Sequence, residues 1–422
     1  MDVVRRIRLK DTSPGDSLVN RHAACPRRSS LASTEMRELP VTTSFSLFTK
    51  IVSGRGTIHD IPKELKGIDA DSVLIVTDPG LSKTEIPGRI AEVLIAAGVR
   101  VEIYGAVEPD PSIRTARAVA DAALSAGAKA LIGLGGGSSI DAAKAGALLA
   151  THTGQLRDFA GVDKVPAPIL PVIAVPTTAG TGSEVTIFSV VSDPDHDEKF
   201  TVASRHLAPR IAVLDPECTV KLPPSVTAMT GMDALTHAVE AASSKIAQPV
   251  TDALAISAVR LIFTSLAKAV QDGTSLVDRE NMLQAAFLAG AAFNSAYLGV
   301  CHALASPLGG HFHIPHGLAN AIVLPHVMDF NVAAAMDKYA AVAVGAGLCP
   351  PGAHPRAAAQ TLIDAVRTLQ RDIGTPIRLR DAGAKEDILP LVARDGLKSI
   401  QLRFNPRPAA EAQMLAVLKA AY

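Results

Sequence analysis

Gly231-Met232-Asp233-Ala234-Leu235-Thr236-His237 is the stretch around which the rest of the chain is organised. It lies in an Ala-rich run, residues 229–242, that contains no Pro and only one early Gly, and this composition predicts a helix. On a helix, Asp233 and His237 are four residues apart and therefore lie one turn apart on the same face. A carboxylate and an imidazole in this arrangement can bind a metal ion, although either residue alone also suits an ordinary buried position.

A second pair of histidines, His302 and His316, follows 14 residues apart, with Pro307 and Gly309-Gly310 between them. Proline and glycine at these positions predict that a helix ends and that a turn and a loop follow, which would bring the side chain of His316 close to that of His302. One Asp and two or three His suit a borderline divalent ion such as Fe²⁺ or Zn²⁺ and suit Ca²⁺ or Mg²⁺ poorly. We therefore predict a site for Fe²⁺, with Zn²⁺ as the alternative.

The composition limits the class of protein. At 422 residues and 43.8 kDa the chain is longer than one hydrophobic core usually serves, so two domains are expected. Hydrophobic residues make up 48% of the chain, but no apolar run appears long enough to span a membrane. Lys and Arg (41) balance Asp and Glu (41), which predicts no nucleic-acid or anionic-membrane partner.

The four cysteines are scattered without CxxC spacing and predict reduced thiols in a cytoplasmic protein. Cys301 stands beside His302, but adjacent residues on a helix point in different directions, so we expect Cys301 to serve packing.

Short apolar runs alternate with helical segments in the first half of the chain. Strands are predicted at 72–77, 101–104, 130–133, 171–175 and 211–214, and helices at 87–97, 115–126 and 140–149. This alternation predicts a parallel sheet that is covered by helices on both faces.

After Pro223-Pro224 the chain changes to long Ala- and Leu-rich segments. Helices are predicted at about 225–243, 249–271, 278–305, 332–346, 353–372 and 408–421. We therefore predict three parts: a disordered extension at 1–40, an α/β dinucleotide-binding domain at 41–218, and an all-α metal-binding domain at 219–422. A mitochondrial-type leader is the alternative for the extension, but its acidic residues do not fit that pattern.

A glycine cluster, Gly133-x-Gly135-Gly-Gly-Ser138, stands where a predicted strand meets a predicted helix. Glycine lets the backbone approach a phosphate, and the helix N-terminus adds free N–H donors, although a tight structural turn would explain the cluster equally well. Asp78 ends an earlier strand and suits a carboxylate that accepts from ribose hydroxyls, which favours NAD over NADP. A Thr-rich loop after the 171–175 strand offers a second set of donors to the dinucleotide, from Thr177, Thr178 and Thr181.

Taken together, four motifs resemble those of the iron-containing (group III) alcohol dehydrogenases. They are Gly135-Gly-Gly-Ser-x-x-Asp141-x-x-Lys144, Pro176-Thr-Thr-Ala-Gly-Thr-Gly-Ser-Glu184, Thr230-Gly-Met-Asp-Ala-Leu-Thr-His-Ala-Val-Glu240 and Ile314-Pro-His-Gly-Leu-Ala-Asn320. The resemblance covers nearly everything from about residue 45 onward and implies an active site between an α/β domain and a helical domain.

The resemblance also implies roles for individual residues. The metal ligands, through which catalysis would run, are Asp233, His237, His302 and His316. The cofactor-binding residues are Asp78, Gly136, Gly137, Ser138, Thr177, Thr178, Thr181, Thr186 and Lys199. Two positions depart from the family pattern: Ser306 stands where many members carry a further His, and Asp110 stands where Asn is typical.

These features predict a metal-dependent NAD(P) alcohol dehydrogenase, with NAD favoured, that interconverts an alcohol and an aldehyde or ketone by hydride transfer, and we expect a homodimer. A hydroxyacid-oxoacid transhydrogenase and a maleylacetate reductase are alternatives within the same chemistry, and Arg205 or Arg210 in the cleft would favour them. The dehydroquinate synthases have a related fold but a different metal motif. A nucleotide-binding sensor with a closed structural metal is the non-enzyme alternative.

Overall fold

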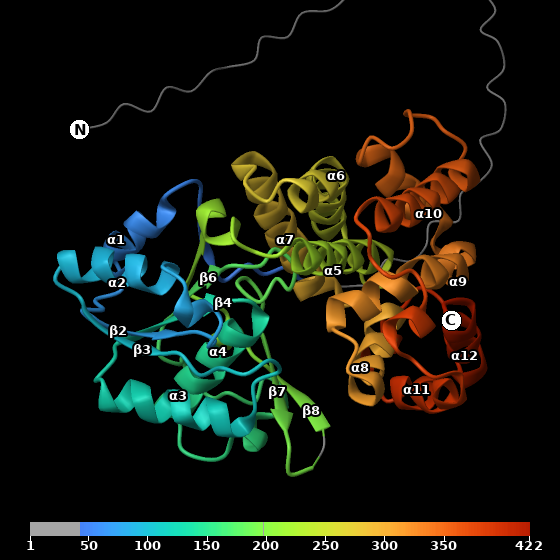
Figure 1. The fold of residues 1–422 in the computed structure, drawn as a ribbon. Helices are drawn as coiled ribbons and strands as arrows, with labels where there is room; N and C mark the ends of the chain where they lie inside the picture. Colours follow the sequence, from blue (N-terminus) through green and yellow to red (C-terminus); the bar gives the residue numbers. More distant parts are fainter. Residues whose placement is uncertain (1–42, 197) are drawn as a thin grey trace, which may run out of the picture. The chain divides into compact units, whose positions relative to one another are not determined.

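The computed structural model describes residues 43–196 and 198–422, which belong to one compact unit (Figure 1). The extension predicted at 1–40 lies outside the described residues. The boundary predicted between residues 218 and 219 stays a prediction. It falls at the end of the short 3-10 helix Pro216–Thr219, between the last strand and the first long helix.

A six-stranded sheet forms the centre of the N-terminal half, and every neighbouring pair of strands is parallel, as the alternating pattern predicted. The spatial order is β1-β9-β6-β4-β2-β3. The strands are β1 (Lys50–Ser53), β2 (Ser72–Val76), β3 (Arg100–Tyr104), β4 (Ala130–Gly135), β6 (Val172–Pro176) and β9 (Ile211–Leu214). The short edge strand β1 was not predicted.

Side chains of the sheet alternate between two covered faces. On β2, Val73 packs with helices α1 and α2, whereas the next residue, Leu74, packs with α3 and α4. These helices are α1 (Ile61–Lys66), α2 (Ile86–Ala96), α3 (Ile113–Ser125) and α4 (Gly137–Thr151). Because both faces are buried, the central strands are continuously apolar, which made them visible in the sequence.

A second, three-stranded sheet was missed. It consists of β5 (Gly161–Val162), β8 (Glu198–Ala203) and β7 (Phe188–Asp193), in that order, and β7 pairs with β8 in antiparallel fashion. One face of this hairpin is partly exposed, so polar and apolar residues mix along it and no apolar run marks it.

Residues 224–422, all of which are described, contain helices and no strand. The long helices are α5 (Pro224–Ser243), α6 (Pro249–Gln271), α7 (Leu276–Ala296), α8 (Val300–Phe312), α9 (His316–Gly345), α10 (Pro355–Asp372), α11 (Leu389–Gly396) and α12 (Glu411–Ala420). Helix α5 is buried without interruption from Gly231 to Ser243 and packs against α6, α7 and α9 (Figure 1). This confirms the all-helical second half.

Several helices differ from the predictions: the helix predicted at 332–346 is the second half of α9, and α11 was not predicted. The helix predicted at 278–305 breaks between α7 and α8, where Tyr297 adopts φ 59°. The loop predicted before His316 is mostly helix, because α8 continues through Pro307 to Phe312 and α9 begins at His316 itself. The turn between the two helices is therefore only three residues long, with His313 in the left-handed conformation.

By length and composition alone, α6 and α9 could each cross a membrane, and a third span would arise if the bent pair α7 and α8 counted as one. The expectation that no segment reaches this length is therefore wrong for α6 and α9. Within the structure, 67% of the apolar window of α9 and 39% of that of α6 is buried. The expected absence of a membrane partner stays a prediction.

Candidate active site

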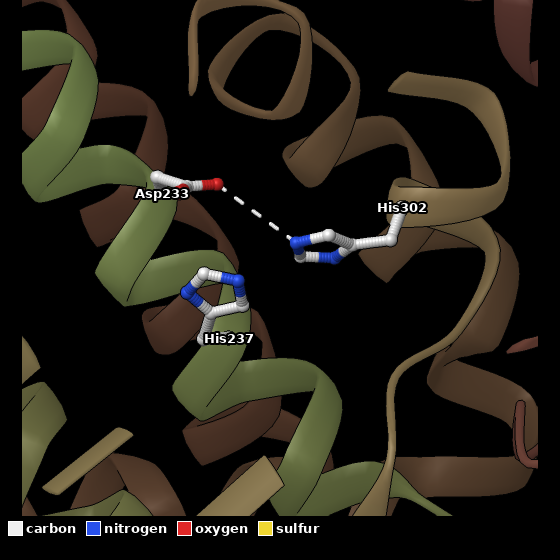
Figure 2. A group of neighbouring side chains, drawn as sticks. All are labelled: Asp233, His237 and His302. Carbon is white, nitrogen blue, oxygen red and sulfur yellow. Dashed lines mark ion pairs between the residues drawn. The ribbon is translucent and has the colours of Figure 1, made fainter. Parts of the chain in front are cut away.

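Helix α5 places a carboxylate and an imidazole side by side. Asp233 and His237 are each 4% exposed, and their spacing sets them one turn apart on one face of the helix. Helix α8 brings His302 to them, with its Nε2 atom 3.8 Å from Oδ1 of Asp233 (Figure 2). One ligand atom from each of these three residues lies within 4.8 Å of the others.

His316, the fourth predicted ligand, lies beside this group. Its Nε2 atom is 3.9 Å from Oδ1 of Asp233, and its side chain is 47% exposed. Among the described residues, the group whose ligand atoms all lie within 4.8 Å of one another does not include it. His316 is thus the most exposed of the four predicted ligands, and its role as a ligand stays a prediction.

Asn320 occupies the centre of the convergence. It lies one turn after His316 on α9, and its Nδ2 donates to Oδ1 of Asp233 at 2.8 Å. The same nitrogen lies 3.1 Å from Nε2 of His302 and 3.2 Å from Nε2 of His316. Its Oδ1 atom is buried and has no hydrogen-bond partner within the described part of the chain.

The donor set fits a divalent cation. Three acceptor atoms surround one small region: a carboxylate oxygen of Asp233 and the Nε2 atoms of His302 and His316 in their metal-binding forms. The single amide nitrogen of Asn320 has only two N–H groups and cannot donate to all three. Nitrogen-rich ligand sets of this kind suit Fe²⁺ or Zn²⁺.

The charges of these residues also fit metal binding. Burial raises the pKa of Asp233, but the imidazoles of His237, His316 and His302 outweigh this effect and hold that pKa below its usual value. Burial lowers the pKa of His237 to about 3. At neutral pH the carboxyl is therefore ionised and the His237 imidazole is neutral, which are the forms that bind metals.

Two of the predicted ligand histidines, His302 and His237, each contact a partner through the ring nitrogen Nδ1. Nδ1 of His302 lies 2.6 Å from the buried carboxylate of Glu240, which also accepts the backbone N–H of Cys301 at 2.7 Å. Nδ1 of His237 lies 3.2 Å from the carbonyl oxygen of Gly180. Such contacts fix the tautomer and leave Nε2 free for a metal.

Glu240 and Gly180 were quoted within motifs, but the sequence assigned them no role. The spacing of Glu240, three residues after His237, could have marked it as a third polar group on the same face of α5.

Cys301, which was expected to serve packing, is fully buried in the hydrophobic core of the helical half. Burial raises the pKa of its thiol well above the usual range.

The predicted dinucleotide loops meet at the carboxyl edge of the main sheet. Helix α4 begins directly after Gly136, so Gly137 and Ser138 lie in its first turn. A Cβ atom on Gly136 would lie 3.3 Å from Oγ1 of Thr178, and a Cβ atom on Gly137 would lie 3.0 Å from the side chain of Thr181. The two loops therefore touch, as expected from the adjacent strands β4 and β6.

Asp78 follows β2, the other neighbour of β4. Its Oδ1 atom accepts from the backbone N–H groups of Gly80 and Leu81, and its Oδ2 atom lies 3.6 Å from the Cβ position of Gly135. The strand order thus places this carboxylate beside the glycine turn, even though it comes earlier in the chain than the usual acidic residue.

The remaining predicted cofactor residues are spread around this edge. Thr177 and Thr186 are buried, whereas Lys199 lies on β8 and pairs with Asp110 at 2.7 Å. The backbone N–H of Asp110 also donates to Oγ of Ser138 at 3.2 Å. The position that departs from the family pattern therefore links the glycine turn to Lys199.

A buried lysine ties α4 to the segment after the Thr-rich loop. Nζ of Lys144 is fully buried and donates to Ser183 Oγ at 3.0 Å and to the carbonyl oxygens of Thr186 and Phe188 at 3.2 Å and 2.7 Å. Asp141 lies 3.7 Å from the same nitrogen and supplies a compensating charge. These contacts explain physically why the motif contains Asp141 and Lys144.

Comparison with known proteins assigns the chain to a family. The model of the iron-containing alcohol dehydrogenases matches residues 49–216, and the model of the C-terminal part of the Fe-containing alcohol dehydrogenase family matches residues 227–422. The chain belongs to the iron-containing alcohol dehydrogenase family. The resemblance inferred from the four motifs is thereby confirmed.

Similar members of this family are NAD-dependent methanol dehydrogenase of Bacillus methanolicus and 1,3-propanediol dehydrogenase of Klebsiella pneumoniae. The first is 38% identical over 377 residues, covering 89% of this chain and 99% of the relative. The second is 40% identical over 371 residues, covering 87% and 96%. The crystal structure of a 1,3-propanediol oxidoreductase superposes with a TM-score of 0.88 at 38% identity, covering 90% of this chain and 100% of that one. The predicted fold class is confirmed, and the chain is an alcohol oxidoreductase of this family.

Two histidines, His311 and His313, follow Ser306 on the same stretch of chain, and neither is among the side chains grouped with Asp233. Ser306 is exposed on α8. His311 pairs with Asp395 at 2.8 Å, and His313 forms the left-handed end of α8.

Replacing Glu240 by Gln should weaken metal binding about 10–100-fold, the usual cost of losing a partner that orients a ligand histidine. The amide cannot accept from both the Cys301 N–H and the His302 ring. Competition with a chromophoric chelator measures the metal dissociation constant, and Glu102→Gln on the exposed edge strand β3 is the control. An unchanged constant in Glu240→Gln would contradict this role.

Glu184 should make folding stability depend on pH. Burial raises its pKa to about 7 from 4.5, so the folded protein keeps a proton that the unfolded chain releases, and stability falls as pH rises from 4.5 through 7. Glu184→Gln should therefore gain up to about 3 kcal/mol over the parent near pH 8 and far less near pH 5. Urea unfolding at both pH values tests this, and an equal difference at both would refute it.

Proposed function

We propose that this protein is an NAD-dependent alcohol dehydrogenase that interconverts an alcohol and an aldehyde or ketone with the help of Fe²⁺, or alternatively Zn²⁺. One observation carries the proposal: the candidate metal site of Asp233, His237 and His302 is hydrogen-bonded to the Thr-rich loop. The contact joins Nδ1 of His237 to the carbonyl oxygen of Gly180. The names of the relatives support the same chemistry.

Asp233, His237, His302 and His316 would hold the ion, and Glu240 and Gly180 orient two of the imidazoles. A divalent ion held by a single carboxylate keeps positive charge and supplies electrophilic stabilisation of the substrate oxygen. Bound NAD supplies the hydride acceptor for alcohol oxidation, and Asp78, the glycine turn and the Thr-rich loop would position it. Ser306 cannot serve as a basic relay, so we expect the proton to leave through water or a ribose hydroxyl.

Aromatic side chains next to the ligands support an uncharged alcohol as substrate. The ring of Phe293 stacks on His237 with centroids 4.4 Å apart, and Phe188 stacks on Phe293 at 6.2 Å. Tyr297 meets Phe188 edge-on at 6.1 Å. This apolar side of the site favours the hydrocarbon part of an alcohol and helps to exclude water.

Hydroxy acids are the second candidate substrates. Arg210 precedes β9 and so lies at the amino edge of the sheet, opposite the predicted dinucleotide loops, which removes it as a carboxylate partner. Lys199 is a candidate partner for the carboxylate of a hydroxy acid, because, besides burial, its charge contributes to lowering the pKa of His316, but Lys199 already pairs with Asp110 at 2.7 Å.

We further propose a cytoplasmic homodimer without nucleic-acid or membrane partners. The free thiols of Cys218, Cys301 and Cys349 support a reducing compartment. Leu47 and Phe48, each 44% exposed ahead of the edge strand β1, support self-association. The balanced net charge of the chain does not favour nucleic acid as a partner.

The metal should be required for activity. Chelator-treated protein should form no NADH from a panel of primary alcohols and diols, and Fe²⁺ added without oxygen, or Zn²⁺, should restore the reaction. Asp233→Asn should bind neither ion and stay inactive, because the site loses its anionic ligand. Absence of NADH formation by the metal-loaded parent with every alcohol and hydroxy acid would refute the proposed function.

Asp78 should set the preference for NAD. Its carboxylate repels a 2′-phosphate, so Asp78→Ser should raise the ratio of kcat/KM with NADP to kcat/KM with NAD by about tenfold or more, equivalent to at least about 1.4 kcal/mol. Asp71→Ser, at an exposed position before β2, is the control. An unchanged ratio in Asp78→Ser would place the ribose elsewhere.

A further inference from the structure

The Thr-rich loop, residues 177–183, is fixed between the predicted dinucleotide site and the metal-binding group. On one side, Thr178 and Thr181 lie against Gly136 and Gly137 of the glycine turn. On the other side, the Gly180 carbonyl meets Nδ1 of His237 at 3.2 Å. One short segment therefore contacts both binding sites.

The approach of this loop to α5 requires glycine. A Cβ atom on Gly180 would lie 2.6 Å from the carbonyl oxygen of Thr230 and 2.7 Å from its Cβ atom. Thr230 belongs to the buried helix α5, one turn before Asp233, so its backbone cannot move aside cheaply. Any larger residue would have to push the Gly180 carbonyl away from His237.

The loop is also fixed from a third direction. A Cβ atom on Gly182 would lie 2.7 Å from Cα of Gly290 on α7, and Ser183 accepts from the buried Lys144 of α4 at 3.0 Å. Contacts with α4, α5 and α7 therefore hold the loop from three sides.

The two ligand histidines differ in what holds them. Glu240 orients His302 from within the helical half, whereas His237 depends on a carbonyl from the loop that follows β6. Because a carbonyl only accepts, Nδ1 of His237 carries the proton and Nε2 keeps the lone pair for a metal. The geometry of this ligand is thus set by the loop that would hold the dinucleotide.

Building on the proposed function, we propose that Gly180 is a positioning residue that couples dinucleotide binding to metal binding. Dinucleotide phosphates that hydrogen-bond to the loop would restrict its backbone further, so the Gly180 carbonyl would be held more firmly against His237 when the metal binds. The coupling is reciprocal, so the metal tightens dinucleotide binding by the same factor.

The test uses the full chain and measures binding rather than turnover. The Zn²⁺ dissociation constant is determined by chelator competition with and without saturating ADP-ribose, which fills the phosphate loops but has no nicotinamide to touch the metal. ADP-ribose should tighten Zn²⁺ binding by at least about fivefold, the lower end of usual couplings between sites. Zn²⁺ should tighten ADP-ribose binding by the same factor.

Gly180→Ala should lose most of this coupling while Gly88→Ala keeps it. A Cβ atom on Gly88 in α2 meets no atom within 4 Å, so this control adds the same methyl group without a clash. If Gly180→Ala does not fold, the parent measurement alone decides. Zn²⁺ affinity that ignores ADP-ribose in the parent, or full coupling in a folded Gly180→Ala, overturns the inference.

The outcomes separate this inference from the proposed function. Protein that binds Zn²⁺ and ADP-ribose independently and still oxidises alcohols keeps the proposed function and loses the coupling. Protein that binds neither loses both.

Discussion

The convergence of Asp233, His237 and His302 is the constraint on which the rest of the structure depends. A buried carboxylate is costly without a compensating charge, and here it faces three imidazoles and one amide. Helix α5, which carries two of the three groups, is correspondingly packed from several sides. The carbonyl oxygen of Met229 lies 2.5 Å from the Cβ position of Gly317, so α9 approaches α5 as closely as the Gly180 loop does.

The order of strands in the sheet joins this site to the dinucleotide side. Strand β4 lies between β2 and β6, so Asp78, the glycine turn and the Thr-rich loop all stand at the same carboxyl edge. The Thr-rich loop then reaches α5 through Gly180. Redox chemistry between a bound alcohol and a nicotinamide needs the two sites to be neighbours, and these short contacts meet that requirement.

The sequence predicted those parts of the molecule that depend on local pattern. The buried strands of the main sheet and helix α5 have strong periodicity or continuous apolar runs, and the spacing of Asp233 and His237 alone places them on one face. The sequence did not reveal features that depend on tertiary contacts. Helix α8 continues through Pro307, and the polar hairpin β7–β8 forms a sheet that no apolar run announces.

The same limit applies to the site. His302 could be recognised as a candidate ligand, but nothing local shows that Glu240, 62 residues earlier, holds its ring. Asn320 was visible only as the end of a motif, and its place among the ligands follows from α9 starting at His316. The break at Tyr297, where α8 bends by 105° from α7, could not be predicted either, because tyrosine rarely adopts positive φ.

Anomalous X-ray scattering from crystals grown with Fe²⁺ or Zn²⁺ would test the metal site most directly. We predict a single anomalous peak within bonding distance of Asp233, His237 and His302, with the Asn320 amide displaced from the centre of the group. A peak at any other position, or none at these side chains in protein that contains one ion per chain, would contradict the account.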